Sequence, residues 1–93
     1  MELKVFTLPT CSGCPVAKMI AFEVAHKYGV AYRVVDMATK EGLDEGLAYQ
    51  VLSAPSIAID EDVIVRGHLI SKKRLEEEVR KRLEKWKARA ASE

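Results

Sequence analysis

The only two cysteines of the chain, Cys11 and Cys14, lie three positions apart in the stretch TLPTCSGCP. Two thiols at this spacing can hold a metal ion, exchange electrons through a disulfide, or be neighbours by coincidence. A zinc site needs four ligands, and only His26 and His68 are available to complete one. Because His26 would lie about three helical turns beyond Cys14, the spacing favours redox chemistry over a zinc site.

The residues from Ser12 onward predict a helix, which would place Cys11 at a helix N-terminus. Free backbone N–H groups and the positive end of the helix dipole favour a thiolate there, and such cysteines have pKa values lowered to about 3.5–7.5 from about 8.5. Cys14 would lie one turn further on, on the same side and more buried. We therefore expect Cys11 to attack a disulfide and Cys14 to resolve the resulting mixed disulfide. Gly13 would let the sulfurs and a partner backbone approach closely.

Seven elements follow from the apolar pattern and the turn formers. Strands are expected at 3–8, 30–37, 56–60 and 63–66, and helices at 12–28, 39–50 and 71–90. Gly29 stands where a helix cap is expected, whereas Gly42 and Gly46 should interrupt the second helix. The strand at 30–37 is almost continuously apolar, which predicts burial on both faces.

The order of these elements indicates an α/β fold. A strand–helix–strand opening requires a right-handed parallel crossover, and the late hairpin adds antiparallel strands. We expect a four-stranded mixed sheet with helices on both faces, in a single domain over residues 1–90, followed by a frayed tail at 91–93.

Composition excludes several classes of function. A net charge of +1 and scattered aromatic residues give no footprint for nucleic acid. No apolar run approaches the roughly 18 residues of a membrane span, and the N-terminus lacks a secretion signal, so we expect a cytoplasmic protein with no membrane partner. The chain contains no Asn and one Gln, with abundant Lys, Arg and Glu, which is a thermophile tendency.

Three features together resemble the thioredoxin/glutaredoxin superfamily. They are the Cys-x-x-Cys that closes a strand and opens a helix, the segment Ser53-Ala54-Pro55-Ser56, and the ending VRGHLISKKRLEEEV. The resemblance implies a minimal thioredoxin fold of order βαβαββα, a cis peptide before Pro55, and thiol–disulfide oxidoreductase activity that needs no cofactor. Besides the catalytic Cys11 and Cys14, it implies substrate-binding roles for Thr10, Ser12, Gly13, Ala54, Pro55, Gly67 and His68.

The subfamily depends on the residues around the cysteines. Thr10 and Ser12-Gly13 stand where thioredoxins usually have Trp and Gly-Pro, and LPTC is nearer the glutaredoxin pattern. Glutaredoxins that use glutathione typically have a basic residue at the position of Leu8, Thr or Val at that of Ala54, and an acidic pair after the glycine of the last strand. This chain has none of these, so we favour a protein substrate over glutathione.

The resemblance also implies partners. We expect a monomer that reduces disulfide-containing proteins and is itself reduced by an external reductase, such as a thioredoxin reductase, or by a small thiol. Two other classes remain open: a carrier of an iron–sulfur cluster or metal that uses the same two sulfurs, and a thioredoxin-fold adaptor with idle cysteines.

Residues 72–74 (KKR) form a basic run at the expected start of the last helix, near Cys11. The run is either a solvated patch balanced by the acidic residues 76–78, or a positive field that recruits an acidic partner or favours the Cys11 thiolate.

Five further residues are expected to have structural or solvent-exposed positions. Lys18 and His68 are interpreted as surface residues, although Lys18 could tune the thiols and His68 could shuttle protons. Asp36 and Asp60 are interpreted as carboxylates close to loops, with no acid–base pair between them. Trp86 is expected to pack on the last helix.

Overall fold

A computed structural model describes residues 1–92, with the backbone alone for residues 86–92. Its elements are β1 (Glu2–Thr7), α1 (Cys14–Tyr28), β2 (Ala31–Asp36), α2 (Lys40–Ala48), β3 (Ser56–Ile59), β4 (Asp62–Val65) and α3 (Lys72–Ser92). This is the order expected from the sequence, and no boundary differs from its expected position by more than two residues. Fraying of residues 91–93 remains a prediction, and Glu93 lies outside the described residues.

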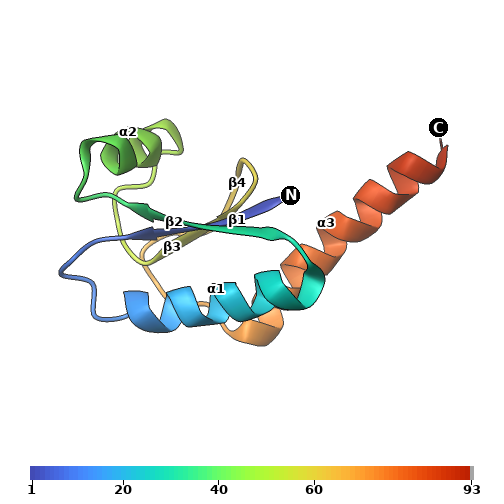
Figure 1. The fold of residues 1–93 in the computed structure, drawn as a ribbon, viewed down its shortest axis with the longest axis horizontal. Helices are drawn as coiled ribbons and strands as arrows, with labels where there is room; N and C mark the ends of the chain where they lie inside the picture. Colours follow the sequence, from blue (N-terminus) through green and yellow to red (C-terminus); the bar gives the residue numbers. More distant parts are fainter. Residues whose placement is uncertain (93) are drawn as a thin grey trace.

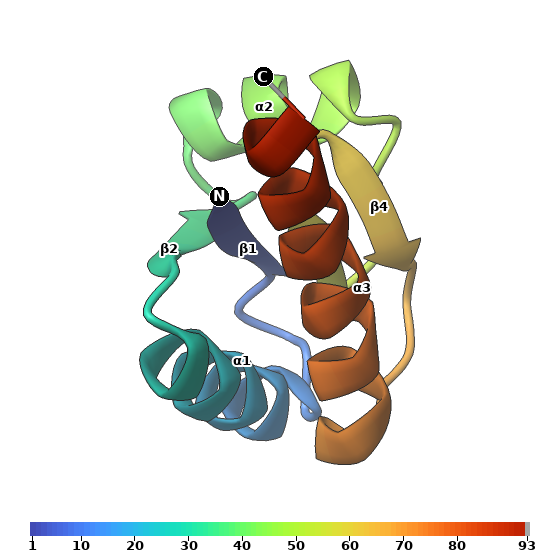
Figure 2. The same ribbon diagram turned by 90° about the vertical axis from the view of Figure 1, so that its right-hand side faces the viewer.

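The four strands form one mixed sheet in the order β2-β1-β3-β4. β1 pairs parallel with β2 and antiparallel with β3, and β3 pairs antiparallel with β4. Helices α1 and α3 lie on one face of this sheet and α2 lies on the other (Figures 1 and 2). The predicted α/β architecture is therefore confirmed.

Alternation along β1 divides the core into two parts, because successive side chains point to opposite faces of a sheet. Leu3 and Val5 point toward α1 and α3, where they join the larger cluster of buried residues. Within α3 an apolar stripe begins with Leu75 and Val79, which are fully buried, and continues with the partly buried Leu83. The side chain of Trp86 lies outside the described residues. Residues 1–92 contain no helix that is both long and apolar enough to cross a bilayer.

The α2 side of the sheet holds a second, smaller cluster. Phe6 of β1 packs there with Val35 and Val51, and Lys4 of the same strand is buried beside them. Lys4 Nζ donates hydrogen bonds to Tyr49 Oη at 2.5 Å and to the Asp60 carbonyl at 2.9 Å. Burial alone would lower the pKa of Lys4, but the contacts with Tyr49 and Glu2 outweigh burial and raise it. The buried lysine is therefore charged and fixes the end of α2 to the sheet.

Gly42 and Gly46 do not interrupt α2, and this expectation was wrong. Both glycines are buried on the side of α2 that faces the rest of the chain. A Cβ added to Gly42 would stand 1.8 Å from the carbonyl oxygen of Asp36, and one added to Gly46 would stand 2.7 Å from Met37 Sδ. The glycines therefore allow α2 to approach the segment that follows β2, and Thr39 caps the helix by accepting a hydrogen bond from Gly42 N at 3.0 Å.

The expected burial of strand 30–37 on both faces was also wrong. β2 lies at the edge of the sheet, and within Ala31–Asp36 only Val35 is buried. An apolar run alone does not distinguish a central strand from an edge strand, because both use the same β-branched residues.

Candidate active site

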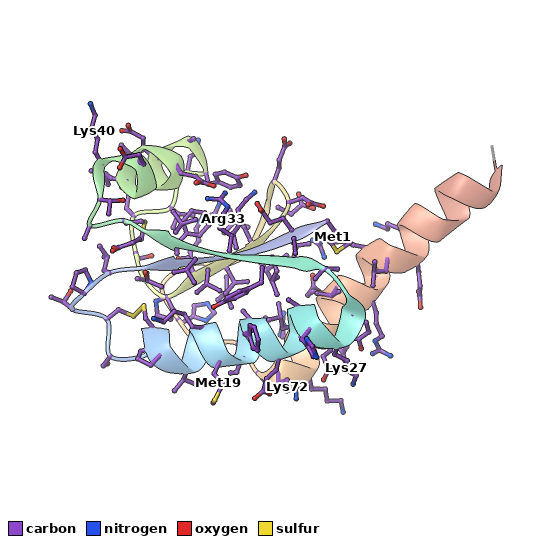
Figure 3. The ribbon with its side chains drawn as sticks, viewed as in Figure 1. Met1, Met19, Lys27, Arg33, Lys40 and Lys72 are labelled. Atoms are coloured by element: carbon purple, nitrogen blue, oxygen red, sulfur yellow. A yellow bond between two sulfur atoms is a disulfide. The ribbon has the colours of Figure 1, made fainter. Side chains whose placement is uncertain are left out.

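The two cysteines follow the C-terminal end of β1, where the chain reverses direction before it enters α1. In that turn the N–H of Cys11 donates to the carbonyl of Leu8 at 3.1 Å. Cys11 and Cys14 form a disulfide, with their Cα atoms 5.4 Å apart, within the usual range for such bonds. Figure 3 shows this bond beside the first turn of α1. The structure therefore describes the oxidised form of the pair.

The first helix begins two residues later than expected. Its first residue is Cys14 and its N-cap is Gly13, so Cys11 lies three residues before the helix rather than directly before it. Pro15 is tolerated at the second helical position because its missing N–H would have had no partner there. In the part of the chain that the structure describes, no side chain caps α1 and no acidic residue stands in its first turn. The positive end of the helix therefore still faces the loop that carries Cys11.

The two sulfurs differ in their exposure to solvent. Cys14 is only 3% exposed, whereas Cys11 is half-buried and its neighbours Thr10 and Ser12 are exposed. A partner molecule can therefore reach Cys11 before it can reach Cys14. This asymmetry is what an attacking thiol and a resolving thiol require.

The Ala54–Pro55 peptide bond is cis, as expected. β3 begins at Ser56, which pairs with Phe6 near the end of β1, so the preceding loop lies at the same edge of the sheet as the cysteines. A Cβ built on Gly13 would lie 3.7 Å from Pro55 Cδ and 3.6 Å from Leu69 Cγ. Gly13 therefore stands where the cysteine loop, the proline loop and the β4–α3 loop meet.

Gly67 supports the proline loop from the end of β4. Its N–H donates to the Pro55 carbonyl at 3.0 Å and lies 3.1 Å from Ser56 Oγ. Its φ of +76° favours glycine, and an added Cβ would stand 2.7 Å from Ser53 Oγ. These contacts give Gly67 a positioning role behind Pro55.

Among the described residues, the hydrogen bonds of four other residues singled out from the sequence do not involve the two sulfurs. The exposed His68 has ring Nδ1 3.1 Å from the carbonyl of its neighbour Leu69, and Lys18 is exposed on α1. Asp36, the last residue of β2, and Asp60, directly after β3, are exposed, and the carboxylate of each accepts a hydrogen bond from a backbone N–H. Among the described residues, no group of three or more His, Cys, Asp or Glu side chains is arranged to hold a metal ion.

The basic run at 72–74 lies further from the cysteines than expected. Lys72 Nζ forms an ion pair with Glu23 of α1 at 3.0 Å, and Glu23 lies more than two helical turns beyond Cys14 at about 3.6 residues per turn. Of the acidic residues 76–78, Glu76 pairs with Lys27 and Glu78 pairs with Arg82. The hydrogen bond from Lys27 lowers the pKa of Glu76. The first turn of α3 therefore lies beside the middle of α1, and Leu69, rather than a cation, approaches Gly13.

Sequence reasoning missed three exposed apolar side chains around the site. Val16 lies in the first turn of α1, Leu52 in the loop before Pro55, and Leu69 in the loop after Gly67. Each stands within three residues of a position already assigned to the site. The available signal was an apolar residue close to Pro15, Pro55 or Gly67 in the sequence.

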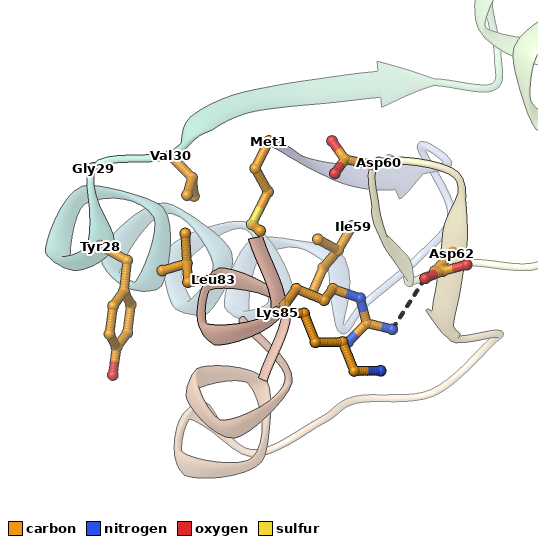
Figure 4. Close-up of a pocket in the computed structure, with 10 residues that line it drawn as sticks. Met1, Tyr28, Gly29, Val30, Ile59, Asp60, Asp62, Leu83 and Lys85 are labelled. Atoms are coloured by element: carbon orange, nitrogen blue, oxygen red, sulfur yellow. Dashed lines mark hydrogen bonds and ion pairs between the residues drawn. The ribbon is translucent and has the colours of Figure 1, made fainter. Parts of the chain in front are cut away.

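A hollow of the described surface lies at the end of the sheet opposite the cysteines. This cavity of about 630 Å³ is lined by Met1, Ile59 and Leu83 among others, and Asp62 at its border forms an ion pair with Arg82 at 3.3 Å (Figure 4). Met1 precedes β1, whereas the cysteines follow the other end of that strand. The cavity is therefore no part of the cysteine site.

Comparison with known proteins gives consistent matches. Residues 1–80 match the family described as "Thioredoxin domain". The chain is 32% identical to a thioredoxin of Methanocaldococcus jannaschii over 83 residues, covering 89% of this chain and 96% of that protein. It is 34% identical to a probable thioredoxin of Archaeoglobus fulgidus over 65 residues, covering 70% of this chain and 71% of that protein.

Solved structures agree on the fold. Thioredoxin 1 from the thermophilic eubacterium Thermosipho africanus aligns with a TM-score of 0.73 at 21% identity, covering 90% of this chain and 96% of that chain. The thioredoxin-like protein BC3987 aligns with a TM-score of 0.56 at 29% identity, covering 78% of this chain and 96% of that chain.

Proposed function

The chain belongs to the thioredoxin superfamily and is a thiol–disulfide oxidoreductase, and from this premise we propose that it reduces protein disulfides through a mixed disulfide formed at Cys11. The observation that carries the proposal is the unequal exposure of the pair, with Cys11 accessible and Cys14 buried behind it. The general partners of such enzymes are disulfide substrates and a reductase that reduces the cysteine pair again.

The reaction begins with the reduced pair. The Cys11 thiolate attacks one sulfur of a substrate disulfide, and the other substrate sulfur leaves as a thiolate and takes a proton from water. Cys14, after losing its proton, then attacks Cys11 Sγ and releases the second substrate thiol. Two electrons pass to the substrate, and the Cys11–Cys14 disulfide that results is the form the structure describes. An external dithiol returns the pair to its reduced state.

Ala54 supports recognition of an extended substrate segment. Within the described residues, no hydrogen bond from the chain itself engages the backbone of Ala54, whereas the neighbouring Pro55 carbonyl is held by Gly67. An extended segment beside Cys11 can therefore pair with the Ala54 backbone as an added strand does. Thr10, Ser12 and Gly13 border the same space from the cysteine loop.

The surroundings of the pair favour a protein over glutathione as the substrate. The exposed Val16, Leu52 and Leu69 offer apolar contacts suited to a protein surface. The exposed His68 follows Gly67, where glutathione-using relatives in the superfamily carry an acidic pair. We therefore propose reduction of protein disulfides in a cytoplasmic setting.

The Cys14→Ser variant tests the proposal. Without the resolving thiol, the mixed disulfide between Cys11 and the substrate has no internal route to break, so we expect a covalent adduct to accumulate. The measurement is non-reducing electrophoresis with mass spectrometry after incubation with a disulfide-containing protein. A Cys11→Ser/Cys14→Ser double variant serves as the matched control and should trap nothing.

Two results would contradict this function. A Cys14→Ser variant that turns over substrate as fast as the parent would show that no resolving step occurs at Cys14. A brown protein containing iron and sulfide after purification without oxygen would instead support the cluster carrier.

A further inference from the structure

The exposed edge of β2 is the largest departure of the structure from the sequence pattern. Among the described residues β2 pairs with β1 alone, and Figure 2 shows it at one side of the sheet, so one row of its backbone N–H and C=O groups has no strand partner. Its sequence, AYRVVD, is that of a buried strand, yet most of it is exposed in the single chain. A strand with this composition at an open edge is a template for pairing with another strand.

Apolar side chains extend this edge onto α1. Phe22 is 55% exposed and meets the ring of Tyr32 edge-on, with ring centroids 5.6 Å apart. Val34, 40% exposed, points to the same face as Tyr32. Phe22, Tyr32 and Val34 therefore place apolar side chains along this edge, and exposed apolar patches on a soluble chain commonly mark interaction sites.

The other edge of the sheet is protected in ways that β2 is not. β4 has four residues, and its register with β3 shifts between Ile57 and Ala58. β2 has six residues and one charge between its ends, Arg33. The guanidinium of Arg33 is turned toward α2, where it binds Glu45 and lowers the pKa of that carboxyl. Arg33 therefore does not place a charge along the edge that would oppose pairing with another strand.

We propose that β2 pairs antiparallel with β2 of a second copy of this chain about a two-fold axis at Val34. A two-fold axis between antiparallel strands places each residue opposite a partner residue whose side chain points to the same face of the sheet. The registers that pair most of β2 are therefore centred either on Arg33 or on Val34. A centre at Arg33 would bring two like charges together. A centre at Val34 places Val34 against its counterpart and Tyr32 opposite the partner's Asp36.

Charge complementarity favours the second copy as the occupant. The Tyr32 hydroxyl donates to the carbonyl of Lys18 at 3.2 Å, so Lys18 lies beside the residue that would face the partner's Asp36. Lys18 is exposed, and its amine can pair with that carboxylate, twice per dimer because the contact is symmetric. The cysteines lie beside β1 and β3 rather than on this edge, so both active sites stay accessible. This proposal departs from the monomer expected from the sequence.

The test is sedimentation equilibrium of the full chain and of the variants Val34→Lys and Leu43→Lys. We expect the parent and Leu43→Lys to sediment as dimers and Val34→Lys as a monomer, because two lysines would meet on the axis. Leu43 is a matched control, since it is a comparably exposed apolar residue (43%) on α2. A parent that is monomeric at high micromolar concentration, or a dimer unaffected by Val34→Lys, would overturn the proposal.

A cross-link checks the register and does not depend on the folding of Val34→Lys. In a Cys11→Ser/Cys14→Ser background, Val34→Cys should form an intermolecular disulfide under mild oxidation, whereas Leu43→Cys in the same background should not. Equal cross-linking of the two variants would contradict the Val34 axis. Disulfide reduction by the Val34→Lys variant at the parental rate per subunit would show that the two proposals are independent of each other.

Discussion

Replacing Cys11 with serine is expected to abolish the reduction of protein disulfides, lowering the rate by at least about a thousandfold. A serine hydroxyl is not ionised near neutral pH and cannot form the mixed disulfide, so the buried Cys14 is left without its accessible partner. The measurement is the rate of protein disulfide reduction with dithiothreitol as the source of electrons. Leu43→Ala, a change on α2 away from the cysteines, should retain the parental rate.

Omitting dithiothreitol separates the roles of the two cysteines, because this dithiol would cleave a mixed disulfide at Cys11. If Cys11 attacks and Cys14 resolves, Cys11→Ser forms no adduct with the substrate, whereas Cys14→Ser accumulates the adduct and completes no turnover through an internal disulfide. A Cys11→Ser variant that retains activity within about tenfold of the parent would exclude Cys11 as the nucleophile.

Replacing Gly42 with alanine should destabilise the fold by about 2–3 kcal/mol, although helix propensity alone predicts stabilisation by about 1 kcal/mol. The added Cβ would stand 1.8 Å from the Asp36 carbonyl oxygen, a backbone atom that also accepts hydrogen bonds from the N–H and hydroxyl of Thr39. Either α2 or the turn before it must move, and both are tied to the sheet. The free energy of unfolding in urea, followed by circular dichroism, measures the effect.

Gly46→Ala is the matched comparison for Gly42→Ala. Its nearest neighbour is the flexible Met37 side chain at 2.7 Å, which can rotate away, although the Val51 carbonyl oxygen follows at 3.0 Å. We expect a smaller loss of stability than for Gly42→Ala. A Gly42→Ala variant more stable than the parent would show that α2 does not pack as closely as the structure has it.

The fold was largely predictable because the residues that end its strands and helices can be recognised from the local sequence. Pro9 ends the first strand, and Gly29 ends α1 in the left-handed conformation with φ of +66°. The active site was predictable because Cys11, Cys14 and Pro55 carry their chemistry in residue type and spacing. The resemblance to a known superfamily then supplied the cis peptide, which no propensity rule would have given.

The features that could not be predicted from the sequence depend on which helices and strands pack against one another. Gly42 and Gly46 resemble helix breakers in sequence, and only the packing of α2 against the residues after β2 shows that they are contact positions. The apolar run of β2 gave no sign that the strand lies at an edge, because strand order is set by the whole sheet. The start of α3 was predicted too near Cys11 because the composition of the β4–α3 loop does not show that this loop runs along α1.

The pH dependence of alkylation of the reduced protein tests the central claim most directly. Iodoacetamide is added at a series of pH values, and the modified residue is identified by peptide mapping. The account predicts that Cys11 reacts first, with half-maximal reactivity well below the value of about 8.5 for a free thiol, while Cys14 stays protected. Equal reaction of both thiols, or a midpoint for Cys11 at or above that of free cysteine, would contradict it.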